Sequence, residues 1–145
     1  MRAIILAAGQ GTRLAPHTND RPKCLVELSG QSMLDRQLAV LQAAGVDDIV
    51  IVGGYRADQL PGHAHEVVVN QDYETTNMVR SLFCAGAALD GGDDILIAYS
   101  DIVYEDRVLK ALLSAPGDVV VAVNTEWRAL WQARMEDPLS DAESL

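Results

Sequence analysis

Two glycines and two cations near the N-terminus form the first group of residues that could do chemistry together. Gly9 and Gly11 follow an apolar run at residues 3–8, and Arg13 and Lys23 come after them. Glycine lets backbone amides approach a ligand closely, and a loop of such amides can cradle a phosphate. Arg13 adds a bidentate partner for phosphate oxygens, and Lys23 adds a compact charge that can follow a phosphoryl group. The spacing therefore indicates phosphate chemistry directly after a strand.

Two well-known phosphate loops do not fit this stretch. A Rossmann fingerprint requires a third glycine three residues after the second, where this chain has Leu14. A P-loop requires Gly-Lys-Ser/Thr after four spacer residues, and the stretch contains no such triplet. On the glycines alone, an ordinary strand-to-helix turn with surface cations remains an alternative.

A carboxylate further along the chain is the second candidate. Asp101 follows the apolar run at residues 95–98, at the carboxyl end of a strand that we expect to be central. Mg²⁺ favours carboxylate oxygens together with substrate phosphates, so Asp101 is a candidate metal ligand. The structural alternative is a turn or capping aspartate ahead of a helix that begins at Glu105 and Asp106.

The elements that must position these residues alternate between strands and helices. Strands are predicted at residues 3–6, 49–52, 67–69, 95–98 and 119–123. Apolar residues share a helical face in three sets, namely Leu34, Leu38 and Leu41; Met78, Leu82 and Ala85; and Val108, Leu109 and Leu112. This alternation predicts a three-layer α/β/α, Rossmann-like core with a mostly parallel sheet. Ligands bind beyond the carboxyl ends of such strands, which is where the glycine loop and Asp101 lie.

The composition limits the class of protein. With 145 residues the chain has the size of one domain, of which residues 125–145 look like a weakly defined tail. Eleven Lys and Arg against 21 Asp and Glu give a net charge of -10, which argues against nucleic acid as a partner. Cys24 and Cys84 belong to no metal pattern, which suits a reducing compartment. No apolar run approaches the roughly 20 residues of a membrane span, so we predict a cytoplasmic protein without membrane contact.

The glycine loop continues into a longer pattern. The stretch LAAGQGTRLAPHTNDRPKCLVELSG, residues 6–30, resembles the signature LxxGxGxRLxPxTxxxPKxLxxxxG of sugar-nucleotide pyrophosphorylases and related nucleotidyltransferases. The resemblance implies a nucleoside triphosphate bound along the loop, attack by an acceptor's phosphate on the α-phosphorus, and release of pyrophosphate. It implies catalytic roles for Arg13, which would hold the triphosphate, and Lys23, which would stabilise charge at the reacting phosphoryl group. It also implies Mg²⁺ at Asp101.

A second stretch narrows the resemblance. Residues 70–85, NQDYETTNMVRSLFCA, lack the GTAxA-like segment of sugar pyrophosphorylases and resemble the phosphocholine cytidylyltransferase-like branch. In that branch the region approaches the base and the acceptor, which makes Gln71 and Asn77 nucleotide candidates and Arg80 a candidate for an acceptor phosphate. A capped amphipathic helix with an exposed arginine is the alternative. The nucleotide-binding set implied by both stretches is Leu6, Ala7, Ala8, Gly9, Gly11, Thr12, Arg13, Gln71 and Asn77.

The tail carries a third likeness to the same branch, a W-x-x-x-W stretch followed by Asp-Ala-Glu. Trp127 and Trp131 are four residues apart and would share a helical face, where they could form a cage for a quaternary ammonium or simply pack together. Asp141 and Glu143 are weaker candidates for the metal site, and a solvated acidic tail is the alternative.

These observations favour a nucleotidyltransferase that transfers CMP from CTP to a small phosphate or phosphonate acceptor such as phosphocholine. The first alternative is a sugar-1-phosphate nucleotidyltransferase that uses UTP or dTTP, and the second is an inactive nucleotide-binding or regulatory module. The chain resembles about the first three-fifths of the family's members, so we expect the C-terminal part of the fold to be missing. Unpaired edge strands would then favour a homo-oligomer.

Overall fold

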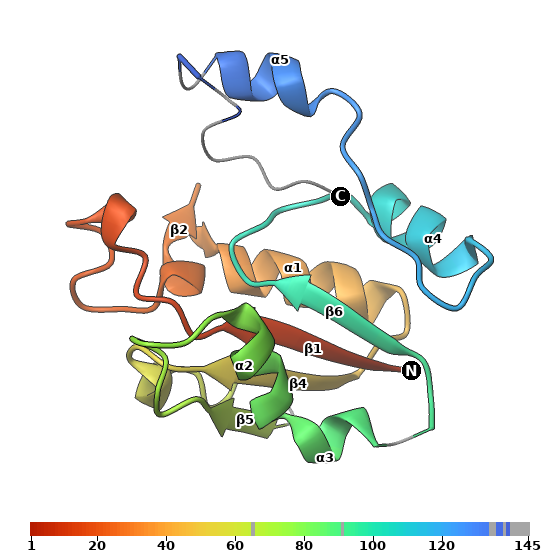
Figure 1. Ribbon diagram of the computed structural model, residues 1–145, viewed down its shortest axis with the longest axis horizontal. Helices are drawn as coiled ribbons and strands as arrows, with labels where there is room; N and C mark the ends of the chain where they lie inside the picture. Colours follow the sequence, from red (N-terminus) through yellow and green to blue (C-terminus); the bar gives the residue numbers. More distant parts are fainter. Residues whose placement is uncertain (65, 91, 134–135, 138, 140–145) are drawn as a thin grey trace. The chain divides into compact units, whose positions relative to one another are not determined.

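The computed structural model describes residues 1–64, 66–90, 92–133, 136, 137 and 139, and Figure 1 shows its elements. The chain divides into two compact units, Met1–Lys110 and Ala111–Leu145. The first unit contains the main sheet and its covering helices. The second unit contains helix α5 (Trp127–Gln132). The predicted phosphate loop and the predicted metal ligand both belong to the first unit.

A parallel sheet forms the centre of the first unit. Its strands are β1 (Arg2–Ala7), β4 (Asp48–Gly53), β5 (Glu66–Val69) and β6 (Ile95–Tyr99), in the order β5-β4-β1-β6. All three pairings are parallel, and Leu6 of β1 lies level with Val52 of β4 and Tyr99 of β6. Four of the five predicted strands are therefore confirmed. Because the strands run in the same direction, the segments that follow β1 and β6 emerge at the same end of the sheet, where the strands have their carboxyl ends.

Helices cover both faces of the sheet, as Figure 1 shows, and this confirms the three-layer prediction. Helix α1 (Met33–Ala43) lies on one face, and α2 (Met78–Cys84) and α3 (Gly86–Leu89) lie on the other. Ser32 caps α1 by accepting a hydrogen bond from the amide of Asp35. The remaining elements are the short hairpin β2 (Glu27–Leu28) and β3 (Gln31–Ser32), helix α4 (Asp106–Ser114), and the 3-10 turns η1 (Thr12–Leu14), η2 (Lys23–Leu25) and η3 (Ala57–Gln59).

Alternating side chains of the strands build the two halves of the core. Ile4, Val50 and Val52 point to the face of α2 and α3, where they pack with Ala85 and Ala88. The intervening residues of the strands point to the opposite face, which α1 covers with a buried stripe of Leu34, Leu38 and Leu41. Both faces of β1 and β4 are thereby buried, which explains why these two strands are continuous apolar runs.

The fifth predicted strand, residues 119–123, is wrong. Within the described residues this segment forms no strand, and Val119, Val121 and Val123 are 85%, 63% and 58% exposed. Valine favours a pleated surface only when a neighbouring strand satisfies the backbone. The described residues of Ala111–Leu145 contain no such strand, so the local preference has nothing to pair with.

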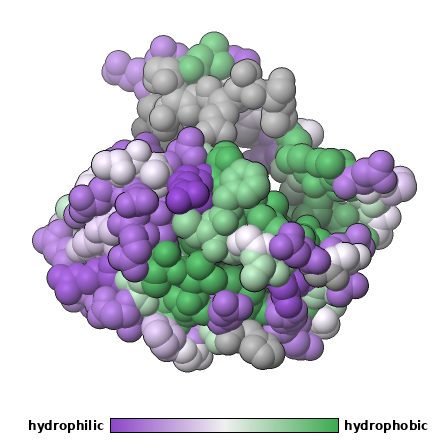
Figure 2. Space-filling model, turned by 60° about the horizontal axis from the view of Figure 1, so that its bottom comes forward, coloured by the Kyte–Doolittle hydropathy of each residue, from purple (hydrophilic) through white to green (hydrophobic). Residues whose placement is uncertain are grey.

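The expected central position of β6 is a second correction, because β6 is an edge of the four described strands. Ile97 lies level with Ile4 and therefore faces the side of α2, yet Ile97 is 49% exposed. Helix α2 packs against β1 and β4 and adds exposed Val79 and Phe83 to the same side. Figure 2 shows that apolar residues gather in the middle of the face in view. Among the described residues, no helix is both long and apolar enough to cross a membrane.

Candidate functional site

The loop after β1 is folded tightly around Gly11. This residue adopts a left-handed conformation (φ 67°, ψ 37°), which glycine tolerates better than other residues, and η1 follows it. The hydroxyl of Thr18, a buried residue, donates to the carbonyl oxygen of Gly11 at 3.0 Å. A Cβ atom on Gly11 would lie 2.9 Å from the Cβ of Lys23. Glycine is therefore needed here both for the turn and for the close passage of the lysine.

The lysine and the predicted metal ligand meet in the structure. The Nζ atom of Lys23 donates to Oδ2 of Asp101 at 2.6 Å, across 78 positions of sequence. Asp101 is placed by β6, because the amide of Ser100 continues the sheet by donating to the carbonyl of Leu6 at 3.1 Å. The two charged side chains are 29% and 37% exposed. The ion pair therefore joins the loop after β1 to the carboxyl end of β6.

A pocket of about 360 Å³ opens at this junction. It is lined by Leu6, Ala8, Gly9, Gly11, Thr12, Arg13, Leu14, Lys23, Tyr73, Thr76, Asn77, Met78, Ser81, Tyr99, Ser100 and Asp101. Of the residues proposed from the sequence in the first unit, three lie outside this lining: Ala7, whose side chain is buried, and Gln71 and Arg80, which are exposed. Their assigned roles stay predictions. The lining combines two cations with one carboxylate, a charge pattern that suits an anion accompanied by a metal ion.

Several pocket residues were not proposed as binding residues from the sequence. Tyr73, Thr76, Met78 and Ser81 come from the loop and helix that follow β5, and Tyr99 and Ser100 from the end of β6. For Tyr73 and Ser100, the position soon after a strand end was a signal that could have identified them. Asn77 caps α2, because its side-chain oxygen accepts from the amides of Val79 and Arg80 at 3.1 and 3.2 Å.

A buried amide organises the loop that leads to α2. Asn70, which is 1% exposed, directly follows β5. Its Nδ2 donates to the hydroxyls of Thr76 (2.9 Å) and Ser81 (3.0 Å), and its Oδ1 accepts from the amide of Asp72 at 3.0 Å. Because Thr76 and Ser81 both line the pocket, Asn70 holds that wall from behind.

Gly54 is the point at which three segments converge. The amide of Tyr55 donates to the carbonyl of Ala8, in the loop after β1, at 3.0 Å. A Cβ atom on Gly54 would lie 2.6 Å from that carbonyl oxygen and 2.6 Å from the Cβ of Tyr73. The absence of a side chain at Gly54 therefore lets Tyr73, a pocket residue, lie close to the glycine loop that follows β1.

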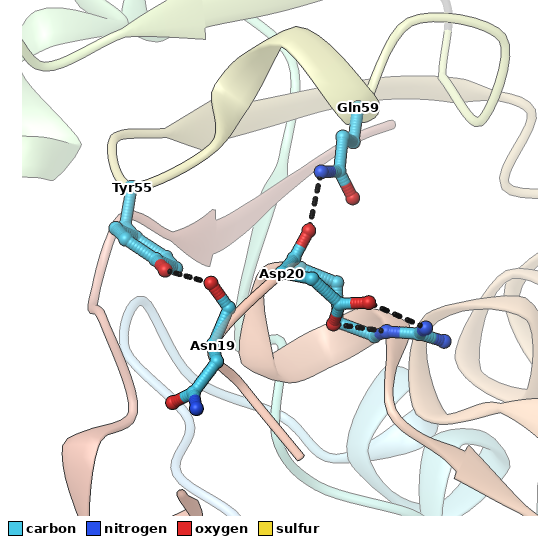
Figure 3. A network of polar contacts seen from close by, with 5 residues as sticks. Asn19, Asp20, Tyr55 and Gln59 are labelled. Carbon is cyan, nitrogen blue, oxygen red and sulfur yellow. Dashed lines mark hydrogen bonds and ion pairs between the residues drawn. The ribbon is translucent and has the colours of Figure 1, made fainter. Parts of the chain in front are cut away.

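The loop between Arg13 and Lys23 is held by hydrogen bonds from the segment that follows β4, as Figure 3 shows. The hydroxyl of Tyr55 donates to the carbonyl of Asn19 at 2.9 Å, and Nε2 of Gln59 donates to the carbonyl of Asp20 at 2.6 Å. Arg21 pairs with the carboxylate of Asp20 (2.9 Å) and thereby lowers the pKa of that carboxyl group. The segment from β4 to η3 thus holds the chain that connects Arg13 to Lys23.

Two buried side chains lie behind the ion pair. Gln37 of α1 is 2% exposed, and its Nε2 donates to the carbonyl of Tyr99 at 3.0 Å, two residues before Asp101. Cys24 is 1% exposed, and burial raises the pKa of its thiol to about 11. At neutral pH the thiol is therefore protonated, which fits a packing role and not nucleophilic attack.

The donor set fits a divalent cation that is completed by a substrate. The described residues contain no group of three or more His, Cys, Asp and Glu side chains that could hold a metal ion. Asp101 offers a carboxylate oxygen at the pocket wall, and the ammonium of Lys23 already occupies a cation's position beside it. Mg²⁺ commonly binds through one or two carboxylates plus substrate phosphates. Asp141 and Glu143 lie outside the described residues.

The tryptophan pair of the second unit lies on one helical face, as predicted. In α5 the rings of Trp127 and Trp131 contact edge to face, with centroids 6.1 Å apart and an angle of 88°. The guanidinium of Arg128 lies 5.0 Å from the ring centroid of Trp127. An aromatic face that already attracts one cation is consistent with a cage, which stays a prediction.

Comparison with known families matches residues 3–144 to the MobA-like NTP transferase domain. A CTP:phosphoglutamine cytidylyltransferase of Campylobacter jejuni is 38% identical over the whole of this chain, which covers 61% of that protein. A 2-aminoethylphosphonate cytidylyltransferase of Lancefieldella rimae is 36% identical over 72% of this chain and 44% of that protein.

A solved structure shares the fold. The CTP:phosphocholine cytidylyltransferase of Streptococcus pneumoniae superposes with a TM-score of 0.63 and 33% identity, over 69% of this chain and 44% of that one. In each of these comparisons the chain spans less than two thirds of the relative's own length.

Proposed function

The chain belongs to the family of MobA-like NTP transferase domains, and from this we propose that it transfers CMP from CTP to a small phosphate or phosphonate acceptor. In this reaction an acceptor oxygen forms a bond to the α-phosphorus of CTP. The bond between the α-phosphorus and the bridging oxygen of the β-phosphate breaks, and pyrophosphate leaves. The attacking oxygen is already anionic, so the reaction requires no general base.

The observation that carries the proposal is the convergence of Arg13, Lys23 and Asp101 on one pocket from three separate segments. Phosphoryl-type transfers are catalysed mainly by positioning and by neutralisation of charge. Arg13 holds the triphosphate with its guanidinium, and the amides around Gly9 and Gly11 contact the phosphate oxygens. Lys23 stabilises the charge that develops at the reacting phosphoryl group.

Asp101 would hold the divalent cation, with Mg²⁺ the natural candidate because its remaining ligands are phosphate oxygens. When bound, the cation screens the charges of the two anionic substrates. The chain's own contribution is to place the Asp101 carboxylate at the end of β6, where the hydrogen bond from Gln37 to the carbonyl of Tyr99 restrains the backbone. Asn77, Gln71 and Arg80 are proposed for the base and the acceptor on the likeness of residues 70–85 to cytidylyltransferases.

The choice of CTP and of the acceptor class rests on the relatives. Cytidylyltransferases for phosphoglutamine, 2-aminoethylphosphonate and phosphocholine all resemble this chain. Their named acceptors share a phosphate or phosphonate group on a small amine-containing or quaternary ammonium molecule. The cytoplasm, which supplies nucleoside triphosphates, is the proposed location, and the two free thiols at Cys24 and Cys84 suit its reducing conditions.

The test is a pyrophosphate-release assay with each of CTP, UTP, dTTP, ATP and GTP in Mg²⁺. The acceptors are phosphocholine, 2-aminoethylphosphonate, a phosphorylated glutamine and glucose 1-phosphate. We expect release with CTP and one of the first three acceptors, and a hundred- to thousandfold lower rate in Lys23→Met because a charge at the reacting phosphoryl group is lost. Arg21→Met is the matched control, since it removes an exposed cation two positions away, and we expect its rate to stay within twofold of wild type.

The alternatives predict other results in the same assay. Release with UTP or dTTP and glucose 1-phosphate would favour the sugar-1-phosphate nucleotidyltransferase. Binding of a nucleotide without release from any pair would favour an inactive nucleotide-binding module. A Lys23→Met rate equal to that of wild type would show that the lysine has no catalytic role.

A further inference from the structure

We infer that Lys23 has a second role in which its ammonium competes with the divalent cation for Asp101. Metal then binds weakly to the protein alone and strongly together with the nucleotide, because the triphosphate gives Lys23 a new partner. The inference rests on the proposed function, since it assumes that Asp101 holds the metal and that Lys23 contacts phosphate.

The first observation is the directness of the contact. The 2.6 Å separation between Nζ of Lys23 and Oδ2 of Asp101 is that of a charge-assisted hydrogen bond. Both side chains are partly withdrawn from water, at 29% and 37% exposure, so solvent screens the pair less than it screens a surface ion pair. A cation that binds Asp101 through this oxygen must displace the ammonium or share the oxygen with it.

The second observation is how the side chain is directed. Gly11 presents no Cβ, and the position that a Cβ would take lies 2.9 Å from the Cβ of Lys23 and 3.3 Å from its Cγ and Cδ. The aliphatic part of the lysine side chain therefore passes close to Gly11, in the loop after β1, before its ammonium reaches Asp101. Because both residues line the same pocket, a ligand bound there offers the ammonium a partner other than the carboxylate.

The charges of the two cations oppose their simultaneous binding to Asp101. An ammonium and a divalent cation on one carboxylate repel each other strongly at hydrogen-bond distances. A bound triphosphate supplies further oxygens to the metal and a negative partner to Lys23, which removes that repulsion. The bound nucleotide therefore raises the affinity for the metal ion. By thermodynamic linkage, the bound metal ion raises the affinity for the nucleotide by the same factor. Before the metal ion and the nucleotide bind, the charges of Asp101 and Lys23 neutralise each other.

The test measures Mn²⁺ binding by electron paramagnetic resonance, without nucleotide, in the whole chain. We expect Lys23→Met to tighten Mn²⁺ binding about three- to fivefold, the change associated with losing a partly exposed ion pair. In the Asp101→Asn background, Lys23→Met should leave Mn²⁺ affinity unchanged, because the shared oxygen is gone. Arg21→Met controls for a general change in net charge, and we expect less than a 1.5-fold effect there.

Equal or weaker Mn²⁺ binding in Lys23→Met would overturn the inference, as would the same gain in the Arg21→Met control. These outcomes leave the proposed function standing if Asp101→Asn still lowers both Mn²⁺ affinity and pyrophosphate release. Absence of Asp101-dependent Mn²⁺ binding in every variant would overturn the inference. If pyrophosphate release also proved independent of Asp101, the proposed metal site would fail with it.

Discussion

At the scale of single residues, Asn70 shows how a side chain remote from the reacting groups can shape the pocket. Both hydrogens of its amide and its carbonyl oxygen are used, by Thr76, Ser81 and Asp72. The hydroxyls of Thr76 and Ser81 donate onward to the carbonyls of Asp72 and Asn77. Only a donor at position 70 can therefore satisfy both hydroxyl oxygens.

Asn70→Asp is expected to lower the free energy of unfolding by about 2 kcal/mol or more, because two donors are replaced by a buried charge that faces two acceptors. Urea denaturation followed by circular dichroism measures this change. Gln42→Glu, the same amide-to-acid change at an exposed position of α1, should stay within about 0.5 kcal/mol of wild type. Equal losses in the two variants would contradict the role given to Asn70.

The chemistry of the loop was accessible from the sequence, since Gly11, Arg13 and Lys23 follow a strand and match a long signature. The partner of Lys23 was not accessible, because a contact between positions 23 and 101 depends on the pairing of β1 with β6. Asn70 was missed for a similar reason. Its sequence neighbours give no sign that its amide is buried, since that burial comes from α2 folding back over the strand end.

At the scale of the elements, the carboxyl ends of β1, β4 and β5 meet at Gly54. A methyl group there would collide with the Ala8 carbonyl and with Tyr73, and backbone cannot move as easily as a side chain. Gly54→Ala is expected to cost about 1–3 kcal/mol of stability. The same change should weaken nucleotide binding, because it displaces the loop after β1.

Gly86→Ala is the matched control for this change. Gly86 begins α3 without a left-handed backbone, and a Cβ atom there would meet nothing within 4 Å. Thermal unfolding should show Gly86→Ala as stable as wild type or slightly more stable, since alanine favours helix. A Gly54→Ala protein as stable as the Gly86→Ala protein would contradict the close convergence at Gly54.

Four strands were predicted correctly because each is an apolar run that pairs with a neighbouring strand in the sheet. Residues 119–123 have the same composition and were predicted wrongly, since strand formation requires a partner that local sequence does not reveal. The position of β6 was misjudged for the same reason. Strand order depends on tertiary contacts, and an apolar run has the same local pattern in a central strand as in an edge strand.

At the scale of the whole molecule, β6 leaves one side without a strand partner among the described residues, and its sequence carries no charge or proline that would discourage pairing. Exposed Ile97, Val79 and Phe83 add apolar surface on the α2 side. The expectation of self-association therefore stays a prediction, and light scattering over a concentration series would test it. A monomer at all concentrations would contradict it.

The proposed site for a nucleoside triphosphate lies at the carboxyl ends of β1 and β6. The most direct measurement is a titration of ¹⁵N-labelled protein with CTP and Mg²⁺, followed through the backbone amide shifts. We predict saturable shifts at Gly9, Gly11, Ser100 and Asp101, with smaller changes along α1. Shifts confined to other parts of the molecule, or none at millimolar CTP, would contradict a nucleotide site at this end of the sheet.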